Sequence, residues 1–136
     1  MRLVPLLVTL LLLACGEPQP PLVATNLEVT KPMPGRQMSA GFLVLTNNTS
    51  EDILISSVTR PQFESVEINE TTIEDGIARM RELGELLVPA NGSVTLERGG
   101  NHLMLMRARS VQDSVTLHLM SGDVPALTVE YSFEEQ

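Results

Sequence analysis

Apolar and polar residues alternate along most of the chain in short runs, which is the pattern of half-buried β-strands. Residues 126–133, ALTVEYSF, show it most clearly, because every second residue from Leu127 to Phe133 is large and apolar. Turn residues such as PMPG, NNTSED, EDG, PANG and SGD separate the runs at intervals of about 8 to 12 residues, which is typical of an all-β sandwich or barrel. Strands are predicted at 23–29, 41–47, 53–59, 64–69, 77–82, 93–97, 102–107, 114–120 and 126–133.

Residues 76–83, GIARMREL, allow a second prediction because they contain good helix formers. A helix of this length between two turn signals would be short and marginal. A strand is therefore preferred for this segment.

The segment GGNHLMLM, from Gly99 to Met106, places a histidine and two methionines at every second position. In a strand, His102, Met104 and Met106 would share one face, and the leucines between them would share the other. Assigning the leucines to the core leaves the histidine and the methionines on an exposed, outward face. Thioether sulfur and imidazole are good ligands for Cu(I), so this face is a candidate half of a soft-metal site.

The N-terminus has the features of a bacterial lipoprotein. Arg2 is followed by an apolar run that is too short to span a bilayer comfortably, which predicts that residues 1–14 are a secretion signal. The run ends in Leu-Leu-Ala-Cys, which resembles the lipobox in which the cysteine, here Cys15, is lipidated. We therefore expect a lipidated Cys15 with a short tether over 15–21, and one domain over 22–136. The chain would lie on the periplasmic side of the envelope, and Gly16 after the cysteine favours the outer membrane.

Charge and composition exclude several function classes. A net charge of −8 and a content of only four aromatic residues, one Tyr and three Phe, argue against nucleic-acid binding. Cys15 is the only cysteine, so neither a disulfide nor a thiol nucleophile is available to the domain. No P-loop, dinucleotide fingerprint, HExxH motif or nucleophile elbow is present, and we expect no enzymatic activity.

The segment from Val66 to Met106 resembles the signature region of the PCu(A)C family of periplasmic copper chaperones. The family motif is a histidine, a methionine eleven positions later, a histidine twenty-two after that and a methionine two further on. These positions are Asn69, Met80, His102 and Met104 here. The flanks ARMREL, LLVPANGSVTLERGG and MSAGFLVLTNNTSEDILI also resemble the family, so the likeness extends over nearly all of the mature chain.

The resemblance implies a cupredoxin-like β-sandwich of the immunoglobulin-like Greek-key type, with about seven to nine strands. It also implies that Met80, His102 and Met104 bind Cu(I). Copper would pass to copper-accepting envelope proteins or respiratory oxidase assembly proteins, notably toward the dinuclear copper centre of cytochrome c oxidase.

Asn69 departs from the family motif, because an amide oxygen is a poor replacement for imidazole on Cu(I). Three interpretations stay open. The other three ligands form a weaker three-coordinate site; or a substitute ligand joins them; or the site has decayed and the domain is a metal-free interaction module of the envelope. Candidate substitutes are Met106, Met38, His118 and Met120.

Overall fold

The structure is a computed structural model that describes residues 17–32, 35–109 and 113–133, and within these ranges it contains eleven strands and no helix. The all-β prediction is confirmed, and residues 76–83 contain a strand and not the alternative helix. There are more strands than expected because residues 53–59 form two short strands and an unpredicted one follows at 86–88. The strands are β1 (Leu22–Val29), β2 (Met38–Asn47), β3 (Ile53–Ile55), β4 (Ser57–Thr59), β5 (Phe63–Glu74), β6 (Ile77–Glu82), β7 (Leu86–Val88), β8 (Ser93–Leu96), β9 (Asn101–Ala108), β10 (Ser114–Ser121) and β11 (Val124–Ser132).

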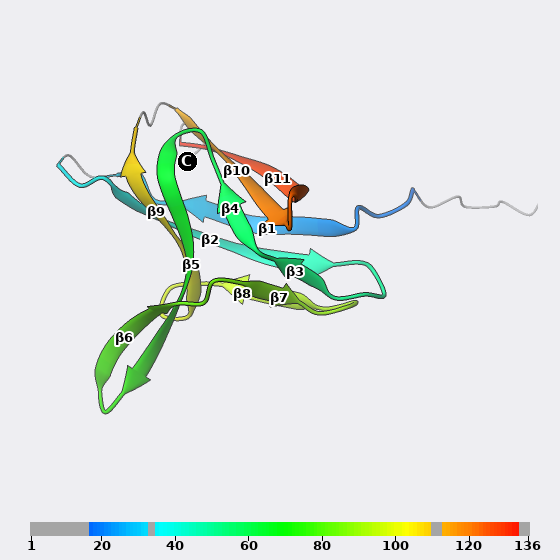
Figure 1. Cartoon of the computed structure of the whole chain (residues 1–136), viewed down its shortest axis with the longest axis horizontal. Helices are drawn as coiled ribbons and strands as arrows, with labels where there is room; N and C mark the ends of the chain where they lie inside the picture. Colours follow the sequence, from blue (N-terminus) through cyan, green and yellow to red (C-terminus); the bar gives the residue numbers. More distant parts are fainter. Residues whose placement is uncertain (1–16, 33–34, 110–112, 134–136) are drawn as a thin grey trace, which may run out of the picture.

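The strands form two principal layers (Figure 1). The larger sheet has the order β1-β2-β9-β5-β6, with β8 also paired to β2. The smaller sheet has the order β11-β10-β4, and it packs on the larger one where β11 contacts β1 and β4 contacts β5. A separate two-stranded sheet, β3-β7, completes the sandwich.

The core lies between the two layers and is built from alternate residues of their strands. Leu103 and Leu105 of β9 are 1% and 0% exposed, and they pack in one cluster with Leu43 of β2 and Leu117 of β10. The prediction that the leucines of GGNHLMLM face the core is therefore confirmed. Because side chains alternate along a strand, the histidine and methionines of β9 lie on the outer face of the larger sheet.

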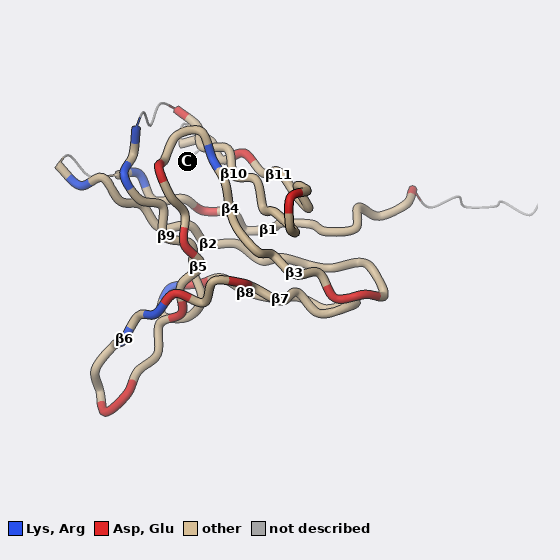
Figure 2. The backbone as a smooth tube through the Cα atoms, viewed as in Figure 1, with Lys and Arg blue, Asp and Glu red and all other residues tan. Residues whose placement is uncertain are grey.

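Strands β5 and β6 form a hairpin whose tip projects away from the rest of the molecule (Figure 1 and Figure 2). Its turn is Asp75-Gly76, and both residues have positive φ angles, 51° and 76°, as the tightest hairpin turns require. Strand β5 is longer than predicted, since it continues to Glu74. The hairpin places β6, and Met80 with it, at the edge of the larger sheet.

In the part of the chain that the structure describes, the core residues lie between Leu22 and Phe133. A fragment of residues 17–136 would contain every described strand, so we expect it to fold without the N-terminal segment. The predicted signal, the lipidated Cys15 and the first part of the tether lie outside the described residues. Among the residues that are described, none form a helix long and apolar enough to cross a membrane.

Candidate metal centre

The outer face of the larger sheet carries the predicted ligands in cross-strand rows. Asn69 of β5 is directly opposite His102 of β9. The next row holds Glu67 of β5, Met104 of β9 and Ala40 of β2. Residues opposite one another in antiparallel strands have Cβ atoms about 5 Å apart, so each row brings its side chains into reach of one another.

Met80 lies on the edge strand β6 and also belongs to the outer face of the larger sheet. It is opposite Thr71, which lies two residues beyond Asn69 on β5 and therefore on the same face. Met80, His102 and Met104 together line one open pocket of about 330 Å³. The structure thus brings the three predicted donors to one pocket, although β5 separates β6 from β9 in the sheet.

His102 is buried, with only 6% of its surface exposed, and the expectation of an exposed histidine is wrong. Its Nδ1 lies 3.0 Å from the carbonyl oxygen of Gly100. A carbonyl can only accept a hydrogen bond, so in the neutral imidazole Nδ1 carries the proton and Nε2 keeps the lone pair that a metal needs. Metal-binding histidines are commonly oriented in this way by a backbone carbonyl.

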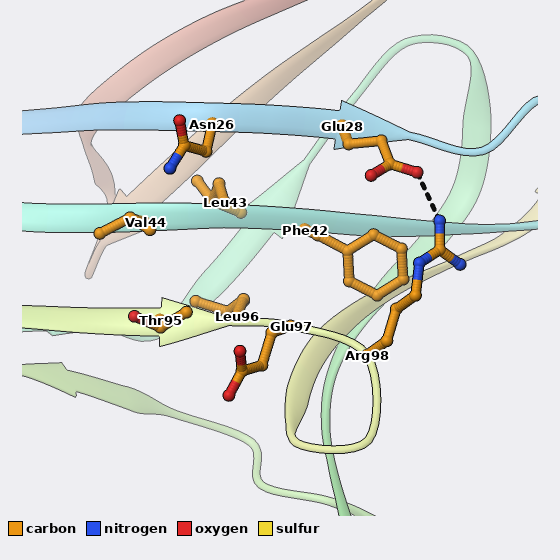
Figure 3. A pocket seen from close by; sticks show the side chains of 9 residues that line it. All are labelled: Asn26, Glu28, Phe42, Leu43, Val44, Thr95, Leu96, Glu97 and Arg98. Atoms are coloured by element: carbon orange, nitrogen blue, oxygen red, sulfur yellow. Dashed lines mark hydrogen bonds and ion pairs between the residues drawn. The ribbon is translucent and has the colours of Figure 1, made fainter.

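His102 is buried by Phe42 and Arg98, which the sequence patterns did not identify as site residues. The Phe42 ring of β2 lies 6.5 Å from the His102 ring, centroid to centroid. The guanidinium of Arg98, in the loop after β8, lies 4.5 Å from the centroid of Phe42 and forms an ion pair with Glu28 of β1. In Figure 3, Arg98 extends beside Phe42 towards Glu28. No local periodicity marks these residues, since they come from three separate elements.

Phe42 and Arg98 line two pockets. One is the pocket of Met80, His102 and Met104. The other, of about 360 Å³, lies between β1, β2 and the end of β8 (Figure 3). The pair therefore forms the wall between the candidate metal pocket and its neighbour.

Asn69 is 4% exposed and faces His102, but it does not line the pocket. Thr71, two residues further on the same strand face, does line it. The asparagine is thus beside the donors and beneath the surface.

The substitute ligands divide into two groups. Met106 and Met38 are directly opposite each other on the same outer face, in the row after Met104. His118 and Met120 belong to β10 of the other sheet, and His118 Nδ1 lies 2.9 Å from Thr128 Oγ1. Only the two methionines can therefore extend the candidate site.

In the described ranges, no three His, Cys, Asp or Glu side chains gather in a way that could hold a metal ion. The donor set that the pocket assembles is two thioethers and one imidazole. Such donors are soft or borderline and carry no charge, which suits a monovalent ion such as Cu(I).

Comparison with known proteins identifies the family. The sequence model described as "Putative lipoprotein LpqE-like" matches residues 22–131. The chain belongs to the LpqE-like lipoprotein family. A curated relative from Leifsonia xyli subsp. xyli, named "Putative lipoprotein Lxx21020", is 28% identical over 101 residues, which cover 70% of this chain and 61% of the relative. The match thus spans about three fifths of that relative's length.

Solved structures similar to this LpqE-like chain include PCuAC domains and the protein DR1885. The copper-bound PCuAC domain from PmoF2 has a TM-score of 0.66 and 15% identity, over 82% of this chain and 91% of that one. Apo-DR1885 from Deinococcus radiodurans has a TM-score of 0.60 and 25% identity, over 97% of this chain and 91% of that one. Its Cu(I) form has a TM-score of 0.58 and 30% identity, over 86% of this chain and 78% of that one. The fold is therefore that of a PCuAC domain.

Proposed function

We propose that this lipoprotein is a copper-binding chaperone of the cell envelope, which holds one Cu(I) ion through Met80, His102 and Met104. The observation that carries the proposal is that these three side chains, from β6 and β9, line one pocket. The likeness to DR1885, whose structure is known with Cu(I), supports it.

The two kinds of ligand have different surroundings. His102 is buried and oriented by Gly100, whereas Met80 is 53% exposed on the projecting hairpin. His102 would therefore be the fixed ligand, and Met80 would be the ligand that a partner can replace first. Because thioethers bind Cu(I) without the strength of a thiolate, stepwise exchange to stronger donors would release the ion. This is binding and transfer, with no catalytic step.

We propose that the recipients are copper-accepting proteins of the envelope, such as those that assemble respiratory oxidases. A lipid anchor at Cys15 would hold the domain close to membrane-bound recipients and raise its effective concentration there. A suitable recipient site would offer thiolate or additional imidazole donors, which bind Cu(I) more strongly than thioethers.

The test is anaerobic competition between residues 17–136 and a chromophoric Cu(I) chelator. We expect one Cu(I) per chain, and loss of that binding in the double variant His102→Ala/Met104→Ala. His118→Ala/Met120→Ala is the matched control, because it removes the same two residue types from β10 of the other sheet. Unchanged copper uptake by the first variant would overturn the ligand assignment.

A metal-free interaction module is the second candidate, and one observation favours it. Ile73 and Ile77, at the tip of the projecting hairpin, are 73% and 59% exposed. Large apolar side chains in such positions are common in protein interfaces. Absence of Cu(I) binding by the unmodified fragment would leave this candidate as the better account.

A further inference from the structure

Two further methionines, Met38 and Met106, lie on the outer face beyond the pocket, in the cross-strand row next to that of Met104. Met106 lies two residues after Met104 on β9 and thus on the same face. Met38, the first residue of β2, is directly opposite Met106. Three thioethers, from Met104, Met106 and Met38, therefore lie within two neighbouring rows.

The spacing of these rows suits a single soft ion. The β-carbons of Met38 and Met106 are about 5 Å apart as a cross-strand pair, and Met104 lies about 7 Å along the strand. A methionine side chain is long and unbranched, so its sulfur can move by several ångströms. All three sulfurs can thus converge on one ion without movement of the backbone.

Access to these rows is open. Met38 is 52% exposed, and Met104 and Met106 are each partly exposed. On β2, the residue between Met38 and Phe42 on this face is Ala40, which is directly opposite Met104. Ala40 belongs to the row of Met104, and its methyl group is too small to block the approach of Met104 to Met38. Met104 can therefore turn towards His102 or towards Met106.

The electrostatics favour a monovalent cation. Thioether ligands contribute no charge, so an ion held by three of them keeps its full charge. Glu67 is directly opposite Met104 on the same face and provides one nearby carboxylate. A divalent ion would bring twice the charge, and it would prefer oxygen or nitrogen donors, which these rows lack apart from Glu67 and Ser65.

We propose that Met38 and Met106 form a second, weaker position for Cu(I), with Met104 shared between this position and the pocket of Met80 and His102. The shared ligand allows an ion to move one row along β9 while it keeps one sulfur bond. The second position is an entry or exit site for the same cargo, so the inference rests on the proposed function for its biological meaning. Its metal chemistry can be tested separately.

The experiment is a titration of residues 17–136, labelled with ¹³C at the methionine methyl groups, with Ag(I) and then with anaerobic Cu(I). Ag(I) is a redox-stable probe for monovalent soft ions. We expect the first equivalent to shift the methyl signals of Met80 and Met104, and the second to shift those of Met38 and Met106. Met120 on β10 serves as the internal control and should not move. Zn(II) should shift none of the methionine signals of the outer face.

The matched variants are Met38→Leu/Met106→Leu, which should lose the second step and keep the first, and Met120→Leu, which should keep both. The proposal is overturned if Met38 and Met106 do not shift at two equivalents, or if they shift only together with Met120. Because each methyl signal is assigned, failure at Met80 with shifts at Met38 and Met106 would overturn the proposed pocket and not this position.

Discussion

Asn69 and His102 lie directly opposite each other in β5 and β9, and both are buried. The PCu(A)C motif that the sequence resembles would place a histidine at the position of Asn69. An imidazole there would arise on the same face and in the same row as His102. Asn69 is therefore the position at which one substitution can add a donor to the candidate site.

We expect Asn69→His to tighten Cu(I) binding by about tenfold or more, which corresponds to ~1.4 kcal/mol, because imidazole replaces a weak amide donor. Chelator competition at one equivalent of Cu(I) measures the change. Asn101→His is the matched control, since Asn101 precedes His102 and points to the other face of β9. Equal or weaker affinity in Asn69→His would mean that residue 69 cannot reach the metal.

The two faces of β9 should respond differently to truncation. Leu105→Ala should lower the free energy of unfolding by about 2–5 kcal/mol, because Leu105 is fully buried in the core. Met104→Ala, one residue away on the outer face, should lower it much less and should weaken Cu(I) binding instead. Urea denaturation monitored by circular dichroism gives both free energies. Equal losses of stability would contradict the assignment of the faces.

The turn of the β5–β6 hairpin should influence the site through Met80. Gly76→Ala should destabilise the hairpin by about 1–2 kcal/mol, because alanine is strained at a φ of 76°. Hydrogen exchange of the β6 amides should increase, and Cu(I) binding should weaken. Gly122→Ala, in the β10–β11 turn with a φ of 60°, is the control that should lose stability and leave copper affinity unchanged. A loss of affinity in both variants would indicate a global effect.

Arg98 should control access to His102. Its guanidinium covers Phe42 and is held by Glu28, so Arg98→Ala should uncover the pocket and make transfer of Cu(I) to a chelator several-fold faster. Stopped-flow mixing with the chelator measures the rate. Arg107→Ala loses a comparable exposed ion pair, with Glu64, and should leave the rate unchanged. Equal rates for the Arg98 variant and the unmodified fragment would rule out a covering role.

Anchoring should depend on Cys15. Cys15→Ala in the full chain should abolish lipid attachment, and the protein should leave the membrane fraction because a lipid-free chain has no acyl anchor. Fractionation with metabolic labelling by a fatty acid measures both effects. Gln19→Ala, a change in the predicted tether, is the control that should retain label and membrane association. A labelled Cys15→Ala variant would show that lipid is attached elsewhere.

The alternation of residues along β9 was sufficient to predict which side chains share a face. It correctly placed Leu103 and Leu105 in the core, and it grouped His102 with Met104 and Met106. It was insufficient to predict the burial of His102, because Phe42 and Arg98 approach from elements distant in the chain. The short strand β7 and the division of residues 53–59 also escaped prediction, since three-residue strands have too few positions to show a period.

The features that could be predicted from the sequence are therefore local: the period of two, the turn residues between strands, the spacing of the motif and the asparagine within it. Which strands are neighbours emerged only from the folded arrangement. The order β2-β9-β5-β6 brings Met80 into the pocket of His102 and places Met38 opposite Met106. The physical reason is that side-chain direction within a strand follows from the backbone of that strand. Contact between strands depends instead on how all of them bury their apolar faces together.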